Sequence, residues 1–138
     1  MKRAFVTGGS GFTGSYLVKA LLDKGYAVKA LVRKESSKKN LEMLGVDLSA
    51  VQFIEGDLAD LESLKGKIED VDTVYHIAAL YRSEGVSTKL FHTVNVEGTR
   101  VLLDQSIKAG VKRFVHCSTV GVQGEIANPP ASEDAPYN

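Results

Sequence analysis

The 138-residue chain lacks most of the features that mark a specialised environment. It has one cysteine, Cys117, so no disulfide forms within the chain, which fits a reducing compartment. Its 17 basic residues balance 17 acidic ones, which argues against a general binder of nucleic acid or anionic membranes. No apolar run approaches the ~20 residues that span a bilayer, and no signal-peptide pattern opens the chain. We therefore expect a cytoplasmic protein with no membrane span and no nucleic-acid partner.

What the chain does have is an ordinary globular composition, with 43% hydrophobic and 25% charged residues, and the size of one domain. Apolar runs predict strands at Arg3–Thr7, Ala27–Val32, Val51–Glu55, Thr73–Ala78 and Lys112–Ser118. Helical spacing and caps predict helices over Phe12–Lys24, within 35–45, from Asp60 through Leu64, and from Ser87 or Thr88 to Gly110, interrupted by a Gly98 suited to close packing.

Strands and helices therefore alternate along the chain. The second, fourth and fifth strands are mostly apolar rather than alternating, which indicates burial on both faces, as in a parallel sheet covered by helices. Right-handed crossovers then favour a doubly wound α/β domain with strand order 3-2-1-4-5 and three αβα layers.

The most informative segment is the glycine-rich turn of residues 7–14, Thr-Gly-Gly-Ser-Gly-Phe-Thr-Gly, between the first strand and the first helix. Gly9, Gly11 and Gly14 have the spacing of a dinucleotide-binding turn, whose pyrophosphate lies at a helix N-terminus. Backbone N–H groups near Phe12 and Thr13 would meet that pyrophosphate. An ordinary structural turn is the alternative. The absence of a Gly-Lys-Ser/Thr ending argues against a nucleoside-triphosphate loop.

Residues after the second and third strands bear on the type of cofactor. Many NAD sites place an acid at the end of the second strand, but here Val32 is followed by Arg33 and Lys34. A basic residue there favours a 2′-phosphate, and so NADP over NAD, unless the pair is only a solvated turn. Asp57 can accept from the exocyclic amine of adenine, with Leu58 packing near the ring, although Gly-Asp is also common turn chemistry.

Histidines predict neither a metal site nor a clear acid or base. His76 lies within an apolar strand, so a structural role is preferred over acid–base chemistry. The spacing of His76, His92 and His116 does not suit metal ligands.

Two further positions carry polar groups near the predicted sheet edge. Asn95, inside the long helix, is expected either to join strands four and five through backbone hydrogen bonds or to lie on the surface. Ser118 and Thr119 end the fifth strand, where a hydroxyl either binds a substrate carbonyl or alcohol or simply caps the strand. No Gly-x-Ser-x-Gly elbow supports a serine nucleophile.

Taken together, these segments resemble the extended short-chain dehydrogenase/reductase family, of the NAD(P)-dependent epimerase/dehydratase type. The resemblance covers nearly the whole chain, and its motifs are jointly specific. They are residues 7–14 and Gly56-Asp57-Leu58, then Tyr75-His76-Ile77-Ala78-Ala79, Asn95-Val96-Glu97-Gly98-Thr99 and Phe114 to Gly124.

The resemblance implies a Rossmann-type NAD(P)-binding domain over residues 1–124, with NADP favoured or NAD as the cofactor. It implies a cofactor site of Gly8, Gly11, Phe12, Thr13, Gly14, Arg33, Asp57, Leu58, Ile77, Ala78, Ala79 and Tyr81, with Asn95 as the family's structural asparagine. It places Thr119, beside Ser118, at the catalytic, substrate-orienting hydroxyl. The implied reaction is hydride transfer at a carbonyl or alcohol carbon of a small molecule, such as a nucleotide sugar, a sterol-like alcohol, or a small aldehyde or ketone.

The chain departs from this family's pattern in two respects. Gln123-Gly124 stands where members often carry Tyr-Gly, which affects a lining residue and not the chemistry. The second departure is larger. The reaction of the family centres on a Tyr-x-x-x-Lys pair, but no tyrosine in this chain has a lysine four residues later. Residues 125–138 then resemble the loop that leads to a missing catalytic and substrate-binding part, and we expect this chain alone to be inactive. A non-catalytic NAD(P)-binding sensor or interaction module is the alternative. An exposed edge at the fifth strand predicts self-association, for example as a homodimer.

Overall fold

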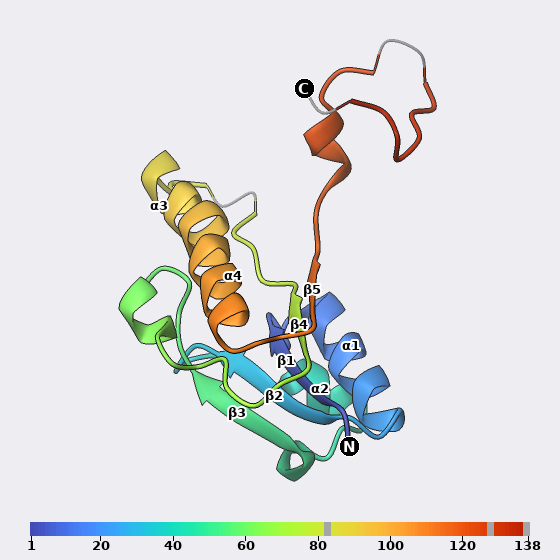
Figure 1. The fold of residues 1–138 in the computed structure, drawn as a ribbon, viewed down its shortest axis with the longest axis vertical. Coiled ribbons are helices and arrows are strands. Elements are labelled where there is room, and N and C mark those ends of the chain that lie inside the picture. Colours follow the sequence, from blue (N-terminus) through green and yellow to red (C-terminus); the bar gives the residue numbers. More distant parts are fainter. Residues whose placement is uncertain (82–83, 127–128, 137–138) are drawn as a thin grey trace.

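The computed structural model describes residues 1–81, 84–126 and 129–136. Its centre is a five-stranded sheet of order β3-β2-β1-β4-β5 (Figure 1), in which every neighbouring pair is parallel. The strands are β1 (Arg3–Thr7), β2 (Ala27–Val32), β3 (Val51–Glu55), β4 (Thr73–His76) and β5 (Arg113–His116). The predicted strand order is confirmed.

Helices cover both faces of this sheet, which confirms the three-layer prediction. The α-helices are α1 (Phe12–Asp23), α2 (Lys39–Met43), α3 (Thr88–His92) and α4 (Gly98–Lys108). Shorter turns are η1 (Leu48–Ala50), η2 (Leu61–Leu64) and η4 (Val120–Gln123), and a π-helical turn, η3 (Thr93–Glu97), joins α3 to α4. In Figure 1, α1 lies on one side of the sheet and α4 on the other.

The alternation of side chains along β1 explains the two cores. Ala4 and Val6 pack with Val18 and Leu21 of α1 on one face. Phe5 packs with Leu102 of α4 on the other face. Because successive side chains point to opposite faces, this one strand, buried from Ala4 to Thr7, supplies both cores and fixes the helices above and below the strand ends.

Two details differ from the predictions. The strands β4 and β5 end at His76 and His116, two residues earlier than expected. The predicted long helix contains the π-helical turn. Gly98 follows that turn, and a Cβ there would lie 2.9 Å from Leu58 Cδ2, so the predicted close packing at this glycine is confirmed.

The predicted burial of the fifth strand on both faces is wrong. Of its four residues only Phe114 is half-buried, and the others are exposed. Phe114 packs toward α4, but the opposite face of β5 has no covering helix among the described residues. After β5 the chain extends away from the sheet to η4 and the C-terminal loop (Figure 1).

Candidate functional site

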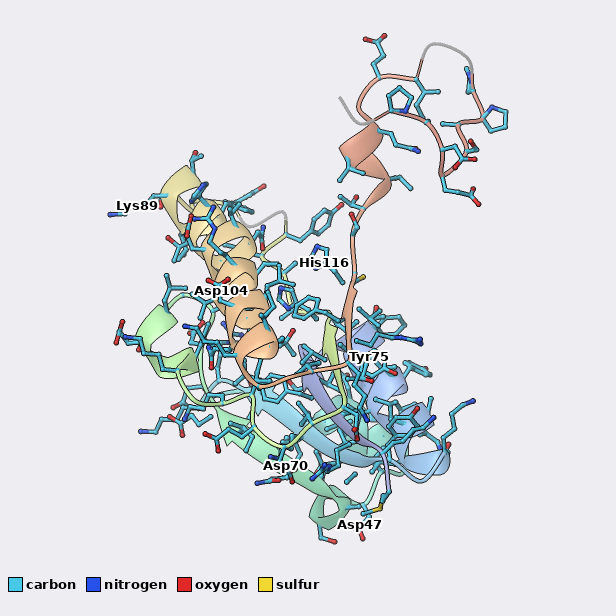
Figure 2. All side chains as sticks on the ribbon, in the orientation of Figure 1. Asp47, Asp70, Tyr75, Lys89, Asp104 and His116 are labelled. Carbon is cyan, nitrogen blue, oxygen red and sulfur yellow. The ribbon has the colours of Figure 1, made fainter. Side chains whose placement is uncertain are left out.

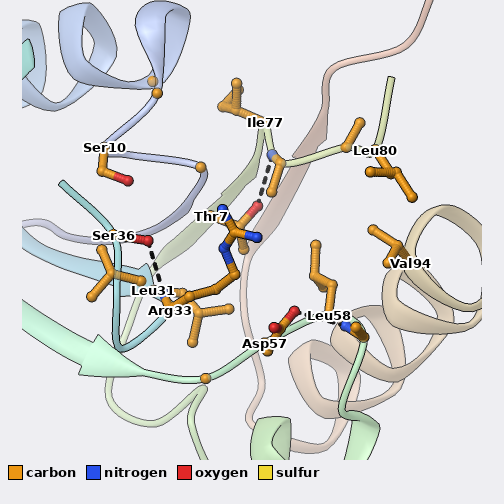
Figure 3. A pocket seen from close by; sticks show the side chains of 18 of the residues that line it. Thr7, Ser10, Leu31, Arg33, Ser36, Asp57, Leu58, Ile77, Leu80 and Val94 are labelled. Atoms are coloured by element: carbon orange, nitrogen blue, oxygen red, sulfur yellow. Dashed lines mark hydrogen bonds between the residues drawn. The ribbon is translucent and has the colours of Figure 1, made fainter. Parts of the chain in front are cut away.

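A cavity of about 660 Å³ opens at the carboxyl ends of the strands (Figure 3). Its walls come from the β1–α1 turn, the end of β2, and the segments that follow β3 and β4, with α3 and the π-helical turn on one side. In an open parallel sheet, this edge is where ligands bind, at the point where the strand order reverses. Here β1 lies at that point, between β2 and β4.

The glycines of the β1–α1 turn make a backbone cradle that no side chain could share. Gly8 has a φ of +71°, which favours glycine. A Cβ on Gly14 would lie 2.0 Å from Gly8 O, and Gly11 N donates to the same oxygen at 3.0 Å. The turn is therefore folded tightly onto the first turn of α1.

The start of α1 has no side-chain cap, a feature it shares with the start of α2 at Lys38. The N-cap of α1 is Gly11, which has no side chain to accept from the first-turn N–H groups. By contrast, Asp47, Asp60, Ser87 and Thr119 each cap a helical turn with a side-chain oxygen. The first N–H groups of a helix have no intrahelical partner, so those of α1 are available to an anion in the cavity.

A basic residue stands at the β2 end of the cavity. Arg33 lines the cavity. The backbone N–H of Arg33 donates to Ser36 Oγ at 3.2 Å, so this hydrogen bond closes the turn after β2. Figure 3 shows the Arg33 side chain extending across the cavity. A second cavity of about 380 Å³ shares Arg33 and adds Lys34 and Lys67, with Glu55 and Asp60 among its acids.

The segment after β3 contributes one polar and one apolar group. Asp57 Oδ1 accepts from Ala59 N at 2.9 Å, which fixes the carboxylate at the cavity wall. Asp57 N donates to Ser63 Oγ at 2.8 Å. Leu58 lines the cavity and is 7% exposed, because it also packs against Gly98.

The segment after β4 is held by side chains from two other elements. Ala78 N donates to Thr7 Oγ1 at 3.1 Å. Asn95 binds both polar atoms of the Leu80 backbone, accepting from its N–H at 2.8 Å and donating to its carbonyl at 2.9 Å. Asn95 thus bonds to backbone as expected, but the expected link to strand five is wrong, since its amide partners lie on the segment after β4.

His76 lies beneath this wall and is 1% exposed. Its Nδ1 is 2.7 Å from Thr7 Oγ1 and its Nε2 is 2.8 Å from Thr99 Oγ1. Burial, and then the charge of His116, lower the pKa of His76 to about 4. Both ring nitrogens are occupied by threonine hydroxyls, so the geometry favours a structural role over acid–base chemistry.

All the predicted cofactor residues except Tyr81 and Asn95 line the cavity. Tyr81 is exposed beyond the wall, and Asn95 acts behind it through Leu80. Ser118 and Thr119 are not among the lining residues. Thr119 instead accepts from Gly121 N at 3.2 Å as the cap of η4, a capping role at a helical turn rather than the strand cap that the sequence left open.

Sequence reasoning missed part of the lining. Ser10, Leu31, Val32 and Ser36 belong to segments already identified, while Leu80, Leu90 and Val94 extend the wall toward α3. The last two are four residues apart, a spacing that places them on one helix face and that could have drawn attention to them.

The described ranges hold neither a metal cluster nor a membrane-spanning helix. No group of three or more His, Cys, Asp or Glu side chains there is arranged to hold a metal ion. Within the same ranges, none of the helices combines the length and the apolarity that a membrane crossing needs.

Comparison with known proteins places this site in a family. The chain is 36% identical over 142 residues to a decarboxylating sterol-4-alpha-carboxylate 3-dehydrogenase of Dictyostelium discoideum, a match that covers 99% of this chain and 42% of the relative. It is 33% identical over 126 residues to a 3-beta-hydroxysteroid dehydrogenase of Mycolicibacterium neoaurum, which covers 87% of this chain and 32% of the relative. The chain thus spans less than half the length of these relatives.

A solved structure and a family model agree with those matches. The dTDP-glucose 4,6-dehydratase DesIV of Streptomyces venezuelae, with NAD and TYD bound, superposes with a TM-score of 0.81 at 34% identity. The superposition covers 99% of this chain and 45% of DesIV. The model of the NAD dependent epimerase/dehydratase family matches residues 4–138. This chain therefore belongs to the NAD dependent epimerase/dehydratase family.

Proposed function

We propose that the cavity binds a nicotinamide adenine dinucleotide and prefers NADPH to NADH. The observation that carries the proposal is the cradle of Gly8, Gly11 and Gly14, where a Cβ on Gly14 would lie 2.0 Å from Gly8 O. Such a turn brings backbone close to a pyrophosphate and aims the open N–H groups of α1 at it. Similar proteins solved with NAD or NAD+ bound support the choice of ligand.

The residues present fit each part of that cofactor. The proposed pyrophosphate site comprises Gly8, Gly11, Phe12, Thr13 and Gly14. Asp57 and Leu58 flank adenine, and Ile77, Ala78 and Ala79 receive the nicotinamide half, with Tyr81 beyond them. When bound, the nicotinamide accepts or supplies a hydride.

The preference for NADPH rests on Arg33. It is the charged side chain at the end of β2, where a ribose 2′-phosphate would lie. A guanidinium forms strong paired hydrogen bonds with phosphate. The end of β2 has no acidic residue to accept a hydrogen bond from a free ribose hydroxyl, since Arg33 and Lys34 come before the first acid, Glu35.

For the whole protein we propose an NAD(P)-dependent oxidoreductase or epimerase/dehydratase acting on a small molecule. Residues 1–124 serve as its cofactor-binding domain, and residues 125–138 lead toward the part that supplies the Tyr-x-x-x-Lys pair. Thr119 and Ser118 orient the substrate there. The relatives act on sterols, steroids or nucleotide sugars by their names, and we assign no single substrate among these classes.

One observation favours a second function, a non-catalytic NAD(P)-binding sensor or interaction module. The hydroxyls of Ser118 and Thr119 lie outside the cavity, and the sequence has no Tyr-x-x-x-Lys pair. A module of this kind needs only the cofactor cavity.

We also propose that β5 supports a homodimer, since among residues 1–81, 84–126 and 129–136 it pairs with β4 alone and presents an open edge. A cytoplasmic location and the absence of a nucleic-acid partner stay predictions from composition.

Calorimetric titration of the chain with NADPH and NADH tests the shared premise. We expect NADPH to bind more tightly, and no binding of either cofactor at millimolar concentration would overturn both functions. An assay of carbonyl reduction with NADPH tests the division of the protein proposed above: we expect no turnover from this chain, and turnover would contradict that division.

A further inference from the structure

Buried and partly buried side chains form a continuous hydrogen-bonded row beneath the wall of the cavity at residues 77–80. Thr7 Oγ1 is 2.7 Å from His76 Nδ1, and His76 Nε2 is 2.8 Å from Thr99 Oγ1. At one end Ala78 N donates to Thr7 Oγ1 at 3.1 Å. At the other end Thr99 Oγ1 donates to the Asn95 carbonyl at 2.8 Å. The row therefore crosses from β1 through β4 to the π-helical turn.

The direction of every bond in this row follows from the Thr99 hydroxyl. A hydroxyl has one proton, and Thr99 gives it to the Asn95 carbonyl. Thr99 must then accept from His76, so Nε2 carries the ring proton. Nδ1 of the neutral ring is left as an acceptor, to which Thr7 donates, while the Thr7 oxygen accepts from Ala78 N.

The other neutral tautomer breaks the row. With the proton on Nδ1, His76 would donate to Thr7, and the Thr7 proton would lose its acceptor. Thr99 would have to leave the Asn95 carbonyl to serve Nε2. An unsatisfied buried polar group is costly, and Thr7 and His76 are 0% and 1% exposed.

The surroundings of His76 also favour the neutral ring. The titratable group that faces it is His116 of β5, with ring centroids 5.3 Å apart, and Phe114 of the same strand packs at 6.0 Å. Thr7 of β1 and Thr99 of α4 face it from the other elements and carry no charge. Burial and the charge of His116 lower its pKa to about 4, so the ring is neutral near pH 7.

Both ends of the row converge on the same stretch of wall. Ala78 is held by Thr7, and Leu80 is held through both backbone polar atoms by Asn95. The Asn95 carbonyl in turn receives Thr99. Ala78 and Leu80 line the cavity, whereas Thr99 and His76 do not.

We propose that His76 and Thr99 are positioning residues that hold Ala78 and Leu80 in place to receive the nicotinamide half of the cofactor. This inference rests on the proposed cofactor binding. A wall that is already ordered lowers the entropic cost of binding, so the row acts on affinity without touching the cofactor.

The test compares Thr99→Val with two matched variants of the full chain. Thr99→Ser keeps the hydroxyl. Ser106→Ala removes a second α4 hydroxyl, which bonds to the Leu102 carbonyl at 2.7 Å, four residues back as Thr99 does, but has no part in the row. NADPH affinity is measured by calorimetry, and amide hydrogen exchange at Ala78 and Leu80 by NMR.

We expect Thr99→Val to weaken NADPH binding about tenfold and to speed exchange at Ala78 by a similar factor, the size of one lost hydrogen bond. Thr99→Ser should restore both values, and Ser106→Ala should keep both near those of the unaltered chain. Equal affinity or equal Ala78 exchange in Thr99→Val and Ser106→Ala would overturn the proposal.

A spectroscopic measurement on the unaltered chain covers the case in which Thr99→Val does not fold. Nitrogen-15 NMR of the His76 ring should show the proton on Nε2, and a proton on Nδ1 would contradict the inferred direction. If the unaltered chain does not bind NADPH, the proposed function falls, while the exchange and tautomer data still decide whether the row holds the wall.

Discussion

The strands β1 and β5 lie in the same sheet but in opposite circumstances. In β1 four of five residues are buried, and it supplies Thr7 and the glycine turn to the cavity. In β5 three of four residues are exposed, and the residues that follow it reach no part of the cavity lining. Both strands are apolar enough in sequence to be read as buried.

This contrast separates the two halves of the expected chemistry. The parts that would hold a cofactor are packed, capped and hydrogen-bonded within the described chain. The hydroxyls expected to orient a substrate, Ser118 and Thr119, stand on an extended segment with one face of β5 uncovered. Binding of a cofactor is thus a property to test on this chain, and substrate chemistry is one to test on the whole protein.

The largest expected effect comes from one methyl group on the β1 side. Gly14→Ala would put a Cβ 2.0 Å from Gly8 O and 2.6 Å from Gly8 C, and both are backbone atoms that have no room to move without opening the turn. We expect a loss of about 3 kcal/mol or more in the free energy of unfolding. NADPH affinity should fall by at least about 100-fold on the scale of ~1.4 kcal/mol per tenfold.

The matched change on the β5 side is Gly121→Ala. Its Cβ would meet Thr119 Oγ1 at an ordinary 3.5 Å, so we expect both quantities to stay close to those of the unaltered chain. Denaturant unfolding and calorimetry measure them, and similar losses in the two variants would erase the contrast between the strands.

Two histidines on adjacent strands sharpen the comparison through pH. In Figure 2, His116 lies on the α4 side of the sheet, the side on which His76 bonds to Thr99, while Tyr75 lies on the α1 side. His76 has a pKa of about 4 in the folded chain against 6.5 as its ordinary value. Between these values the unfolded chain binds more protons, so stability rises with pH.

The stability contribution of neutral His76 is therefore complete above pH 6.5 and is lost as pH falls through 4. Its full size is about 3 kcal/mol, from ~1.4 kcal/mol per pKa unit. Urea unfolding of the unaltered chain and of His76→Gln across this range should show the difference between them shrinking as the pH falls. His116→Gln should raise the pKa of folded His76 only slightly, because burial is the larger cause of the lowered pKa. The pH range over which stability changes should therefore become only a little narrower. If the difference in unfolding free energy between the two chains does not change with pH, the lowered pKa of folded His76 is contradicted.

The next effect concerns cofactor choice. Arg33→Asp should weaken NADPH binding about 30-fold, the size of one or two charge-assisted hydrogen bonds, and should leave NADH binding unchanged or stronger. Arg113→Asp makes the same charge change on exposed β5, outside both cavities, and should alter neither affinity. Calorimetric titration gives all four values. An unchanged preference in Arg33→Asp, or tighter NADH binding in the unaltered chain, would refute the NADPH assignment.

Sequence patterns predicted the β1 side well because its signals are local. The glycine spacing of residues 7–14, the apolar runs and the helix ends each depend on neighbours within a few residues, and together with right-handed crossovers they predicted the strand order. The full set of cofactor residues came from the family resemblance, which itself rests on short motifs.

The misses depend on contacts between distant parts of the chain. Nothing local to Asn95 says that its partner is Leu80, 15 residues earlier. Nothing local to Thr99 says that it completes a row with Thr7 and His76. Likewise, the apolar residues of β5 could not report that only one face of the strand is covered.

The smallest expected effect tests the open side itself. Val115 is 37% exposed on β5, and Val115→Lys places a charge on the strand proposed to pair between copies of the chain. Charged residues on edge strands oppose such pairing, so sedimentation should show weaker self-association. The free energy of unfolding of the monomer should change by only about 0.5 kcal/mol or less, as for most surface substitutions.

Val120→Lys, on the 85% exposed Val120 beyond the strand, is the control and should leave association unaltered. If the unaltered chain is monomeric at high concentration, or if both variants associate equally, β5 is not the contact, and its exposed face would have to be explained by the rest of the protein alone.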